Sequence, residues 1–370
     1  MNITDIETIV CSDQAEFGDL GGGREVVLVK VHTDAGITGI SYFPTLIASF
    51  GGHGRIAASI IAGPLKNILV GEDPLSIERL WEKMFNGTMR WGRRGITMHC
   101  IAALDIALWD LKGKVAGLPL HKLLGGYRDR VPVYANAAFH MPPDKLAAKA
   151  AEYVGQGFEA VKIRTARSAV TLEEATERVK AVREAVGPNI RIMCDCNCTW
   201  DADTAIRMLK KWEKYDIFWL EEPVMPDDIP GFAKIAANTG TAIAAGENHC
   251  YRSEFRDLIT RGGVSIIQAD AIRVGGITEW LKIAGMAAAW NIPVAPHNLQ
   301  EVHVHLMGAF PIGLYIEFFA PENPLHGFLH HVIKQPPEIQ RAEKSTIGVP
   351  QKPGLGFEFD EEVVARTRIA

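Results

Sequence analysis

Residues 191–223 read RIMCDCNCTWDADTAIRMLKKWEKYDIFWLEEP and contain one repeat of the pattern that decides the fold. One short β-type run begins at Arg191, and a second begins near Ile217. Between them Ile206, Leu209 and Trp212 recur at the three-residue step of an amphipathic helix. The segment is therefore predicted to be a strand–helix–strand unit.

The same alternation extends through most of the chain. Strand-like runs with helical stretches between most of them begin near Val131, Ala160, Arg191, Ile217, Ala242, Val264, Pro293 and Leu314. Thr171 and Glu174 form a capping box that starts one of these helices. Eight such strands favour a parallel (β/α) barrel. An open doubly wound sheet is the alternative, but its usual glycine-rich phosphate loop is missing from the run YANAAF at Tyr134.

Residues 1–127 differ in texture and predict an α+β domain. Residues 25–32 are rich in β-branched side chains, and a second strand is expected around Ile40 to Tyr42. From Thr97 to Ala116 apolar residues recur on one helical face. The chain is accordingly divided into an α+β domain (1–127), a barrel domain (128–335) and an irregular C-terminal segment (336–370).

Charge and composition exclude several classes of protein. Lys and Arg number 39 against 44 Asp and Glu, a net charge of −5, whereas nucleic-acid-binding domains are usually basic. No apolar run is long enough to cross a membrane, and the acidic N-terminus lacks the basic start of a signal peptide. Six cysteines in 370 residues are too few for a disulfide scaffold. We expect a cytoplasmic enzyme with no nucleic-acid or membrane partner.

Seven consecutive predicted barrel strands end in polar side chains. In strand order these are Lys162 and Arg164, Asp195 and Asn197, Glu221, Glu247, Asp270, His297 and Glu317. The active sites of (β/α) barrels form at the carboxyl ends of the strands. The sequence therefore predicts that polar groups from seven strands converge at one end of the barrel. Charged residues placed at random in surface loops would not recur at the end of every strand.

Three of these groups suggest a metal site. Asp195, Glu221 and Glu247 end adjacent strands, and their carboxylates would repel one another without a cation. An all-oxygen set of ligands favours Mg²⁺ over zinc. Glu222 directly follows Glu221 and points the opposite way in a strand, so the residues alone leave open which of the two faces inward.

Strand alternation also separates Asn197 from the neighbouring thiols. In an extended strand Asp195 and Asn197 share one face, whereas Cys194, Cys196 and Cys198 share the other. The Cys-x-Cys-x-Cys run could be a second metal motif. Outward packing of small apolar thiols against helices is the favoured interpretation.

Asp270 and His297 form a candidate acid–base pair. A carboxylate that is hydrogen-bonded to a histidine fixes its tautomer and raises its basicity. His249, His303 and His305 are weaker candidates, which we expect in loops or in packing. Lys162 and Arg164 share a strand face, from which they can pair with the carboxylates.

Taken together, these stretches resemble the enolase superfamily, and within it the mandelate racemase subgroup. The resemblance covers nearly the whole chain. It is carried by Arg93-Arg-Gly-Ile-Thr-Met, Ala103-Leu-Asp-Ile-Ala-Leu-Trp-Asp, Leu123-Leu-Gly-Gly, Lys162-Ile-Arg, Asp195-Cys-Asn, Trp219-Leu-Glu-Glu-Pro, Gly246-Glu247, Asp270 with Gly275-Gly276, Pro296-His297-Asn298 and Ile316-Glu317.

The resemblance implies a modified (β/α)7β barrel and a role for each strand-end group. Asp195, Glu221 and Glu247 would bind one Mg²⁺, which selects Glu221 over Glu222. His297, oriented by Asp270, would remove the proton α to a substrate carboxylate. Lys162 and Glu317 would contact that carboxylate, with Glu317 donating a hydrogen bond when it is protonated.

The resemblance further implies that residues 1–127 and the C-terminal segment form a capping domain. Its loops around residues 17–24 and 50–55 would close over a small-molecule carboxylate substrate. Asp19, His53 and Arg55, together with Asn197 from the barrel, are the candidate substrate-binding residues. Relatives often form symmetric oligomers, so a homo-oligomer is expected.

One departure from the family pattern bears on the reaction. Racemases of this subgroup typically have Lys-x-Lys on the second strand, where this chain has Lys162-Ile-Arg164. Arginine is a poor base near neutral pH because its pKa exceeds ~12. A single base on the His297 face disfavours racemisation and favours loss of the β-hydroxyl as water.

The sequence thus predicts an acid-sugar dehydratase that forms a 2-keto-3-deoxy acid from an aldonate or aldarate. A racemase or epimerase of a 2-hydroxy acid and a cycloisomerase remain the alternatives among enzymes. A non-catalytic member of the family is a further one, disfavoured by the intact carboxylate set and His–Asp pair.

Overall fold

The computed structural model describes residues 1–12, 25–45, 52–137, 141–166, 170–323, 326–336, 338 and 342–370. Asp19, a candidate substrate-binding residue, lies outside these ranges. Among the described helices, none combines the length and the apolar character that crossing a membrane requires.

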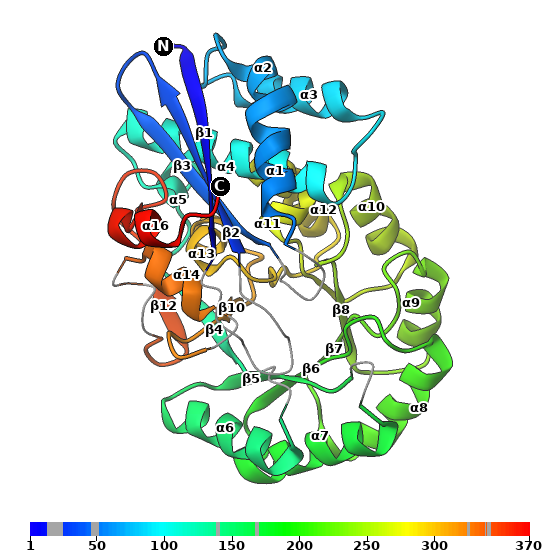
Figure 1. Ribbon diagram of the computed structural model, residues 1–370. Coiled ribbons are helices and arrows are strands. Elements are labelled where there is room, and N and C mark those ends of the chain that lie inside the picture. The colour runs from blue at the N-terminus through cyan, green and yellow to red at the C-terminus, as the bar shows by residue number, and fades with distance from the viewer. Residues whose placement is uncertain are drawn as a thin grey trace.

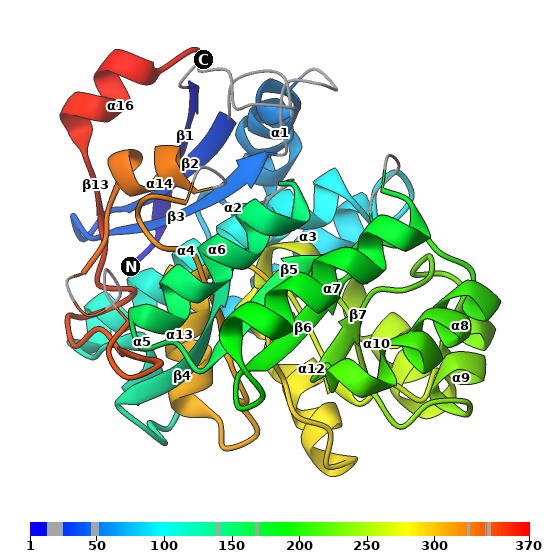
Figure 2. The same ribbon diagram turned by 90° about the horizontal axis from the view of Figure 1, so that it is seen from below.

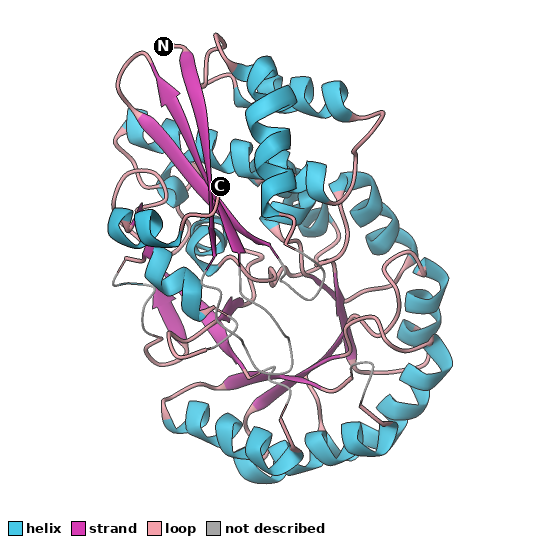
Figure 3. Cartoon of the chain, viewed as in Figure 1, coloured by secondary structure: helices cyan, strands magenta, loops and turns pink. Residues whose placement is uncertain are grey.

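An antiparallel three-stranded sheet and a long helix form the N-terminal part (Figures 1 and 3). The strands are β1 (Ile3–Ser12), β2 (Glu25–Thr33) and β3 (Thr38–Thr45), in that order. The helices are α1 (Gly54–Ile60), a π-helical turn (Ile61–Leu65), α2 (Lys66–Leu69), α3 (Ile77–Thr88), α4 (Ile96–Ala116) and α5 (Leu120–Leu123). Helix α4 packs on β3 so closely that a Cβ at Gly39 would lie 2.1 Å from the Ala107 carbonyl oxygen. The sheet and α4 match the predicted α+β texture.

A curved parallel sheet forms the second part. Its strands pair in the order β10 (Ile316–Phe318), β4 (Arg130–Asn136), β5 (Ala160–Arg164), β6 (Arg191–Asp195), β7 (Trp219–Glu221), β8 (Ala242–Ala245) and β9 (Ile266–Ile267). The intervening helices are α6 (Pro143–Gly155), α7 (Leu172–Val186), α8 (Ala202–Trp212), α9 (Ile229–Ala236), α10 (Tyr251–Arg261), α11 (Ala271–Val274), α12 (Ile277–Ala289) and α13 (Gln300–Ala309). Helices α6 to α9 line the outside of the curve (Figure 1). This is the predicted barrel architecture.

The seventh predicted strand differs from the expectation. Around Pro293 no regular strand forms in the described chain; Val294 instead makes isolated parallel bridges to Ile267 and Gly313. These bridges still join β9 to the segment before β10. The N-cap half of the predicted capping box is confirmed, because the Glu174 N–H donates to Thr171 Oγ1 at 3.1 Å and α7 begins at Leu172. The Glu174 carboxylate accepts from Arg178 instead, with Arg178 Nη2 at 2.8 Å.

Large and small apolar side chains together fill the barrel interior. The buried residues of this layer are Tyr134, Ala160, Met193, Trp219, Ala244, Ile266, Ala295 and Tyr315. The barrel is therefore a packed core rather than a pore, as in other barrels of this kind. The polar groups that follow these residues along the strands lie above this layer.

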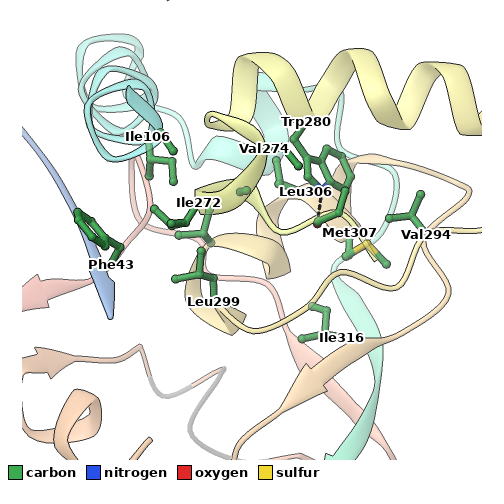
Figure 4. Packing of buried hydrophobic residues seen from close by; sticks show 14 of the residues in the cluster. Phe43, Ile106, Ile272, Val274, Trp280, Val294, Leu299, Leu306, Met307 and Ile316 are labelled. Carbon is green, nitrogen blue, oxygen red and sulfur yellow. Dashed lines mark hydrogen bonds between the residues drawn. The ribbon is translucent and has the colours of Figure 1, made fainter. Parts of the chain in front are cut away.

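Buried contacts join the N-terminal part to the barrel. The Trp81 indole N–H donates to the Gly275 carbonyl at 2.6 Å, and the Thr278 N–H donates to Asp105 Oδ2 at 2.9 Å. Figure 4 shows Phe43 and Ile106 of the N-terminal part facing Ile272 and Leu299 of the barrel. One continuous hydrophobic cluster therefore spans both parts.

The C-terminal segment contacts both parts. It contains β12 (Thr346–Gly348), β13 (Glu358–Phe359) and α16 (Glu361–Thr367), and it follows α14 (Gly327–Val332) and β11 (Ile333–Lys334). Strand β12 pairs antiparallel with β4 of the barrel, whereas the Ile369 N–H donates to the Val10 carbonyl of β1 at 2.7 Å. Helix α16 accordingly lies beside the N-terminal sheet (Figure 2).

Candidate active site

The backbone register brings the first strand-end groups together. Arg164 of β5 is the Cα partner of Asp195 on β6, and Asp195 is the partner of Glu221 on β7. All three residues end their strands. Parallel pairing thus carries these side chains to one edge of the sheet.

Lys162 is the central cation of this edge. Its ammonium Nζ lies 2.7 Å from Glu221 Oε1 and 2.6 Å from Glu317 Oε1, with all three side chains buried. Burial alone would lower the pKa of Lys162, but the charges of Glu221 and Glu317 hold it well above its ordinary value. Lys162 is therefore charged and cannot act as a base in this arrangement.

Glu317 is an acceptor rather than a donor in this structure. Burial would raise its pKa, but Lys162 and His297 lower it below the ordinary value. Its carboxylate accepts hydrogen bonds from Asn136 Nδ2 at 2.6 Å and from the Asn298 N–H at 2.8 Å. The expected donation from a protonated Glu317 to a substrate carboxylate stays a prediction, whereas in this arrangement Glu317 accepts hydrogen bonds from its neighbours.

Each of the three candidate metal ligands interacts with a cation of the protein. Lys162 contacts Glu221, Arg164 Nη2 lies 3.5 Å from Asp195 Oδ2, and Arg273 Nη1 lies 3.4 Å from Glu247 Oε1. Accordingly, no three Asp, Glu, His or Cys side chains of the described chain already converge as a metal cluster. Burial and the charges of Asp195 and Glu247 nevertheless raise the pKa of Glu221, with Lys162 opposing them.

Asn197 orients the Asp195 carboxylate. Strand β6 ends at Asp195, and Asn197 adopts a left-handed conformation with φ of +44°. Its backbone N–H donates to Asp195 Oδ1 at 2.9 Å. The extended strand stops before Asn197 and Cys198, so alternation does not place them. The expected proximity of Asn197 to Asp195 nevertheless holds, since Asn197 Nδ2 donates to Asp195 Oδ2 at 3.3 Å. Cys194 and Cys196 are buried, free thiols.

Glu222 is buried but serves the adjacent loops. It has a φ of +39°, which turns it out of strand β7. Its carboxylate accepts hydrogen bonds from Asn248 Nδ2 at 2.5 Å and from the Cys198 thiol at 3.1 Å. Glu221 rather than Glu222 thus contacts Lys162, in agreement with the choice that the resemblance implied.

Asp270 and His297 form the expected pair. His297 Nδ1 lies 2.8 Å from Asp270 Oδ2, and His297 Nε2 lies 3.5 Å from Glu247 Oε2. Burial alone would lower the pKa of His297, but the Glu247 charge and the Asp270 hydrogen bond raise it to about 9. The second Asp270 oxygen accepts from the Ile272 N–H at 2.8 Å and so caps α11.

A cavity of about 450 Å³ lies between this site and the N-terminal part. From the barrel it is lined by Glu247, Asp270, Arg273 and Asn298, among others. From the N-terminal part it is lined by His53, Arg94 and His99, among others. His53, a predicted substrate-binding residue, lines this cavity, whereas Arg55 is exposed and donates to the Ile369 carbonyl at 3.2 Å.

Sequence reasoning missed several residues of this site. Arg273 donates to the Glu247 carbonyl at 3.0 Å and to Asn248 Oδ1 at 2.7 Å. It lies on α11, beyond the strand ends, although it follows Asp270 by only three residues. Arg94 and His99 line the cavity from the segment around the start of α4, a position that strand spacing does not reveal.

Fold and site together define a capped (β/α)-barrel enzyme with a carboxylate-rich mouth. The family model for the N-terminal domain of mandelate racemase / muconate lactonizing enzyme matches residues 20–125. The model for the enolase C-terminal domain-like family matches residues 145–363. The chain therefore belongs to the enolase superfamily, in the mandelate racemase / muconate lactonizing enzyme family.

Named relatives include isomerases and hydro-lyases. The 3,6-anhydro-alpha-L-galactonate cycloisomerase of Streptomyces coelicolor is 34% identical, over 93% of this chain and 92% of the relative. The L-talarate/galactarate dehydratase of Salmonella typhimurium is also 34% identical, over 93% of this chain and 83% of the relative. The structure of L-talarate dehydratase from Polaromonas sp. JS666, complexed with Mg and L-glucarate, has a TM-score of 0.87 and 32% identity, covering 100% of this chain and 98% of that one.

Proposed function

We propose that the chain is a Mg²⁺-dependent dehydratase of an acid sugar, an aldonate or aldarate, that forms a 2-keto-3-deoxy acid. The observation that carries this proposal is an asymmetry of the mouth. The His297–Asp270 pair lies on one side of the three carboxylates. On the other side, Arg164 of β5 contacts Asp195, at the position where racemases of this family have a second lysine.

The carboxylate set fits a hard divalent cation by its chemistry. Asp195, Glu221 and Glu247 offer only oxygen donors, the type that Mg²⁺ prefers. Burial, reinforced by the charges of Asp195 and Glu247, raises the pKa of Glu221, and a bound cation would relieve both effects. These three residues would hold the ion, which when bound supplies Lewis-acid stabilisation of negative charge on the substrate carboxylate.

His297 carries the proton in both halves of the reaction. Its Nδ1–H donates to Asp270, so its Nε2 takes the proton α to the carboxylate. The same Nε2–H then protonates the β-hydroxyl, which leaves as water while the C–O electron pair departs with it. Because Glu247 contributes the largest upward effect on the His297 pKa, neutralising that carboxylate brings the imidazole closer to the neutral form that a base requires.

Lys162 and Arg164 supply fixed positive charge. Lys162 is buried and charged, and it stabilises the extra negative charge that develops on the substrate as the α-proton leaves. Arg164 Nε is buried with no hydrogen-bond partner in the described chain, so it offers a free donor to a substrate hydroxyl or carboxylate. His53 and Asn197 are proposed to contact the polyol chain, and Asp19 keeps the same proposed role.

A library of mono- and diacid sugars incubated with Mg²⁺ and assayed for 2-keto acid tests this proposal. Dehydration of at least one member is expected. The proposal fails if no member yields keto acid while polarimetry detects inversion of a chiral 2-hydroxy acid.

A cycloisomerase is the second candidate, favoured by the Streptomyces coelicolor relative. A single base, His297, on one face of the substrate α-carbon also suits this reaction, because the proton on that carbon is transferred only once. The two candidates differ in their products: cycloisomerisation opens or closes a ring without forming free water. Incubating an anhydro-sugar acid or lactone in the same library, with mass spectrometry of the products, distinguishes them.

A further inference from the structure

His303 connects the backbones that follow Asp270 and His297. It lies in the first turn of α13 and is fully buried. The Ala271 N–H donates to His303 Nε2 at 3.0 Å, and His303 Nδ1 lies 2.7 Å from the Asn298 carbonyl oxygen. Ala271 directly follows Asp270, and Asn298 directly follows His297, so one imidazole spans the two strand ends that hold the acid–base pair.

The sheet itself does not hold these two ends together. In the described chain, the last backbone hydrogen bond between β9 and the segment at Val294 runs from the Ala295 N–H to the Ile267 carbonyl at 2.9 Å. His297 and Asp270 lie two and three residues beyond this point. The backbone at Asn298 is left-handed, with φ of +57°, so regular pairing cannot continue. The cross-strand link at this height is therefore made by side chains.

The two partners fix the tautomer of His303. A backbone N–H only donates, so Nε2 must accept from Ala271. A carbonyl only accepts, so Nδ1 must be protonated and donate the hydrogen bond to the Asn298 carbonyl oxygen. Burial lowers the pKa of His303, which agrees with a neutral ring. Both bonds are thus satisfied by one protonation state.

We propose that His303 is a positioning residue that sets the separation of Asp270 and His297 and thereby holds the His297 Nδ1–H on the Asp270 carboxylate. The proposal rests on the proposed function only in that it takes His297 as the base. The link continues from Asn298, whose N–H donates to Glu317 Oε2 at 2.8 Å. A shift of one strand end would therefore move His297 relative to the substrate carboxylate site as well.

Three variants and a control on the same helix test the proposal. His303→Leu removes both hydrogen bonds, His303→Asn retains reach only toward Asn298, and His303→Gln offers an amide that can donate and accept. The control is His305→Leu: His305 is also buried on α13, but its Nε2 lies 2.9 Å from the Leu355 carbonyl in the C-terminal segment.

The first readout is the proton spectrum of ¹⁵N-histidine-labelled protein, which does not depend on turnover. The His297 Nδ1–H bonded to Asp270 gives a downfield resonance, assigned by its loss in His297→Asn. We expect His303→Leu and His303→Asn to shift or broaden this resonance. His303→Gln and His305→Leu are expected to leave it near its wild-type position.

The second readout is the kinetics of the reaction established by the substrate screen. Because misplacing a reacting group by ~1 Å can cost about 10²-fold, kcat of His303→Leu is expected to fall ~10- to 100-fold. KM should change little, since the residues that bind the substrate remain, and His303→Gln should recover most of kcat.

An unchanged His297 resonance in His303→Leu or His303→Asn overturns the proposal, whatever the activity. Equal losses in the His303 and His305 variants overturn it too, because they indicate only a general loss of stability. If His303→Leu does not fold, the comparison of His303→Asn with His303→Gln decides. If no acid sugar is dehydrated, the proposed function fails, whereas the spectrum still tests the positioning role.

Discussion

The two halves of the barrel mouth position their functional groups in different ways. Between β5, β6 and β7 the backbone ladder reaches the functional residues themselves, because Arg164 pairs with Asp195 and Asp195 pairs with Glu221. Between β9 and the segment at Val294 the ladder stops early, and Asp270 and His297 lie beyond it. One half is ordered by main-chain pairing and the other by side chains.

This difference predicts a difference in sensitivity. Main-chain pairing survives most side-chain substitutions, so the carboxylate half should keep its geometry when a single group is changed. The base half depends on individual side chains such as His303, so one substitution there can move the reacting nitrogen.

The largest effect is expected at the carboxylate half, from Asp195→Asn or from removal of divalent ions with EDTA. Activity should fall by at least ~10³-fold, because Lewis-acid stabilisation is worth several kcal/mol. Added Mg²⁺ should restore the EDTA-treated wild type but not the variant. Thermal unfolding should change little, since the β6 ladder does not use the carboxylate. A large drop in the Tm of Asp195→Asn would contradict the contrast.

Next in size is the loss of the base. His297→Asn should lower kcat by ~10²- to 10⁴-fold, the usual contribution of a positioned general base. Exchange of the substrate α-proton with deuterated solvent should disappear together with turnover. Calorimetric titration with Mg²⁺ serves as the control and should give the wild-type affinity. Near wild-type turnover would show that the base is assigned wrongly.

A smaller effect is expected from Arg164→Lys. Losing one charge-assisted donor corresponds to ~10- to 100-fold in kcat/KM, from about 1.5–3 kcal/mol per bond. A lysine can also titrate when it is buried, so solvent deuterium should enter the recovered substrate from the second face. Arg164→Met is the matched variant. It loses the same donor, but methionine cannot transfer a proton, so no solvent deuterium should enter the substrate from the second face. Equal deuterium content in both variants would contradict this interpretation.

The smallest effect concerns stability rather than turnover. Burial raises the pKa of Asp105 to about 7, although its hydrogen bonds with Thr278 oppose the shift. The folded protein thus retains a proton that the unfolded chain releases at lower pH, and this contribution to stability is lost as the pH rises toward and through 7.

Asp105→Asn keeps both possible hydrogen bonds without the charge. Its unfolding free energy relative to the wild type should therefore increase on the order of 2–3 kcal/mol between pH 5 and pH 8. Thermal or urea unfolding across this range measures the change. A constant difference between Asp105→Asn and the wild type would mean that Asp105 is already ionised when folded.

Much of the fold and of the candidate site could be predicted from spacing. Parallel strands that end about one βα unit apart must bring their last residues to one edge, so Asp195, Glu221 and Asp270 could be found without coordinates. The family pattern then separated Glu221 from Glu222, which alternation alone could not do. The structural reason is a left-handed turn at Glu222, for which a non-glycine residue gives no local signal.

The remaining features depend on three-dimensional contacts with the backbone. Asn197 was placed by alternation, which fails as soon as the strand ends at Asp195. His303 looked like a packing residue because its partners are main-chain groups, which every sequence contains. Arg94 and His99 reach the cavity only through the docking of the N-terminal part on the barrel.

The two thiols that flank Asp195 give the molecule a built-in reporter. Cys194 and Cys196 are free and buried, and burial raises the pKa of both, so alkylating reagents find almost no thiolate in the closed barrel. Cys194 lies on β6 and Cys196 directly follows it, so their modification requires this part of the barrel to open and expose them. The rate of alkylation at these sites therefore records how often the ligand-bearing strand opens, without any introduced label.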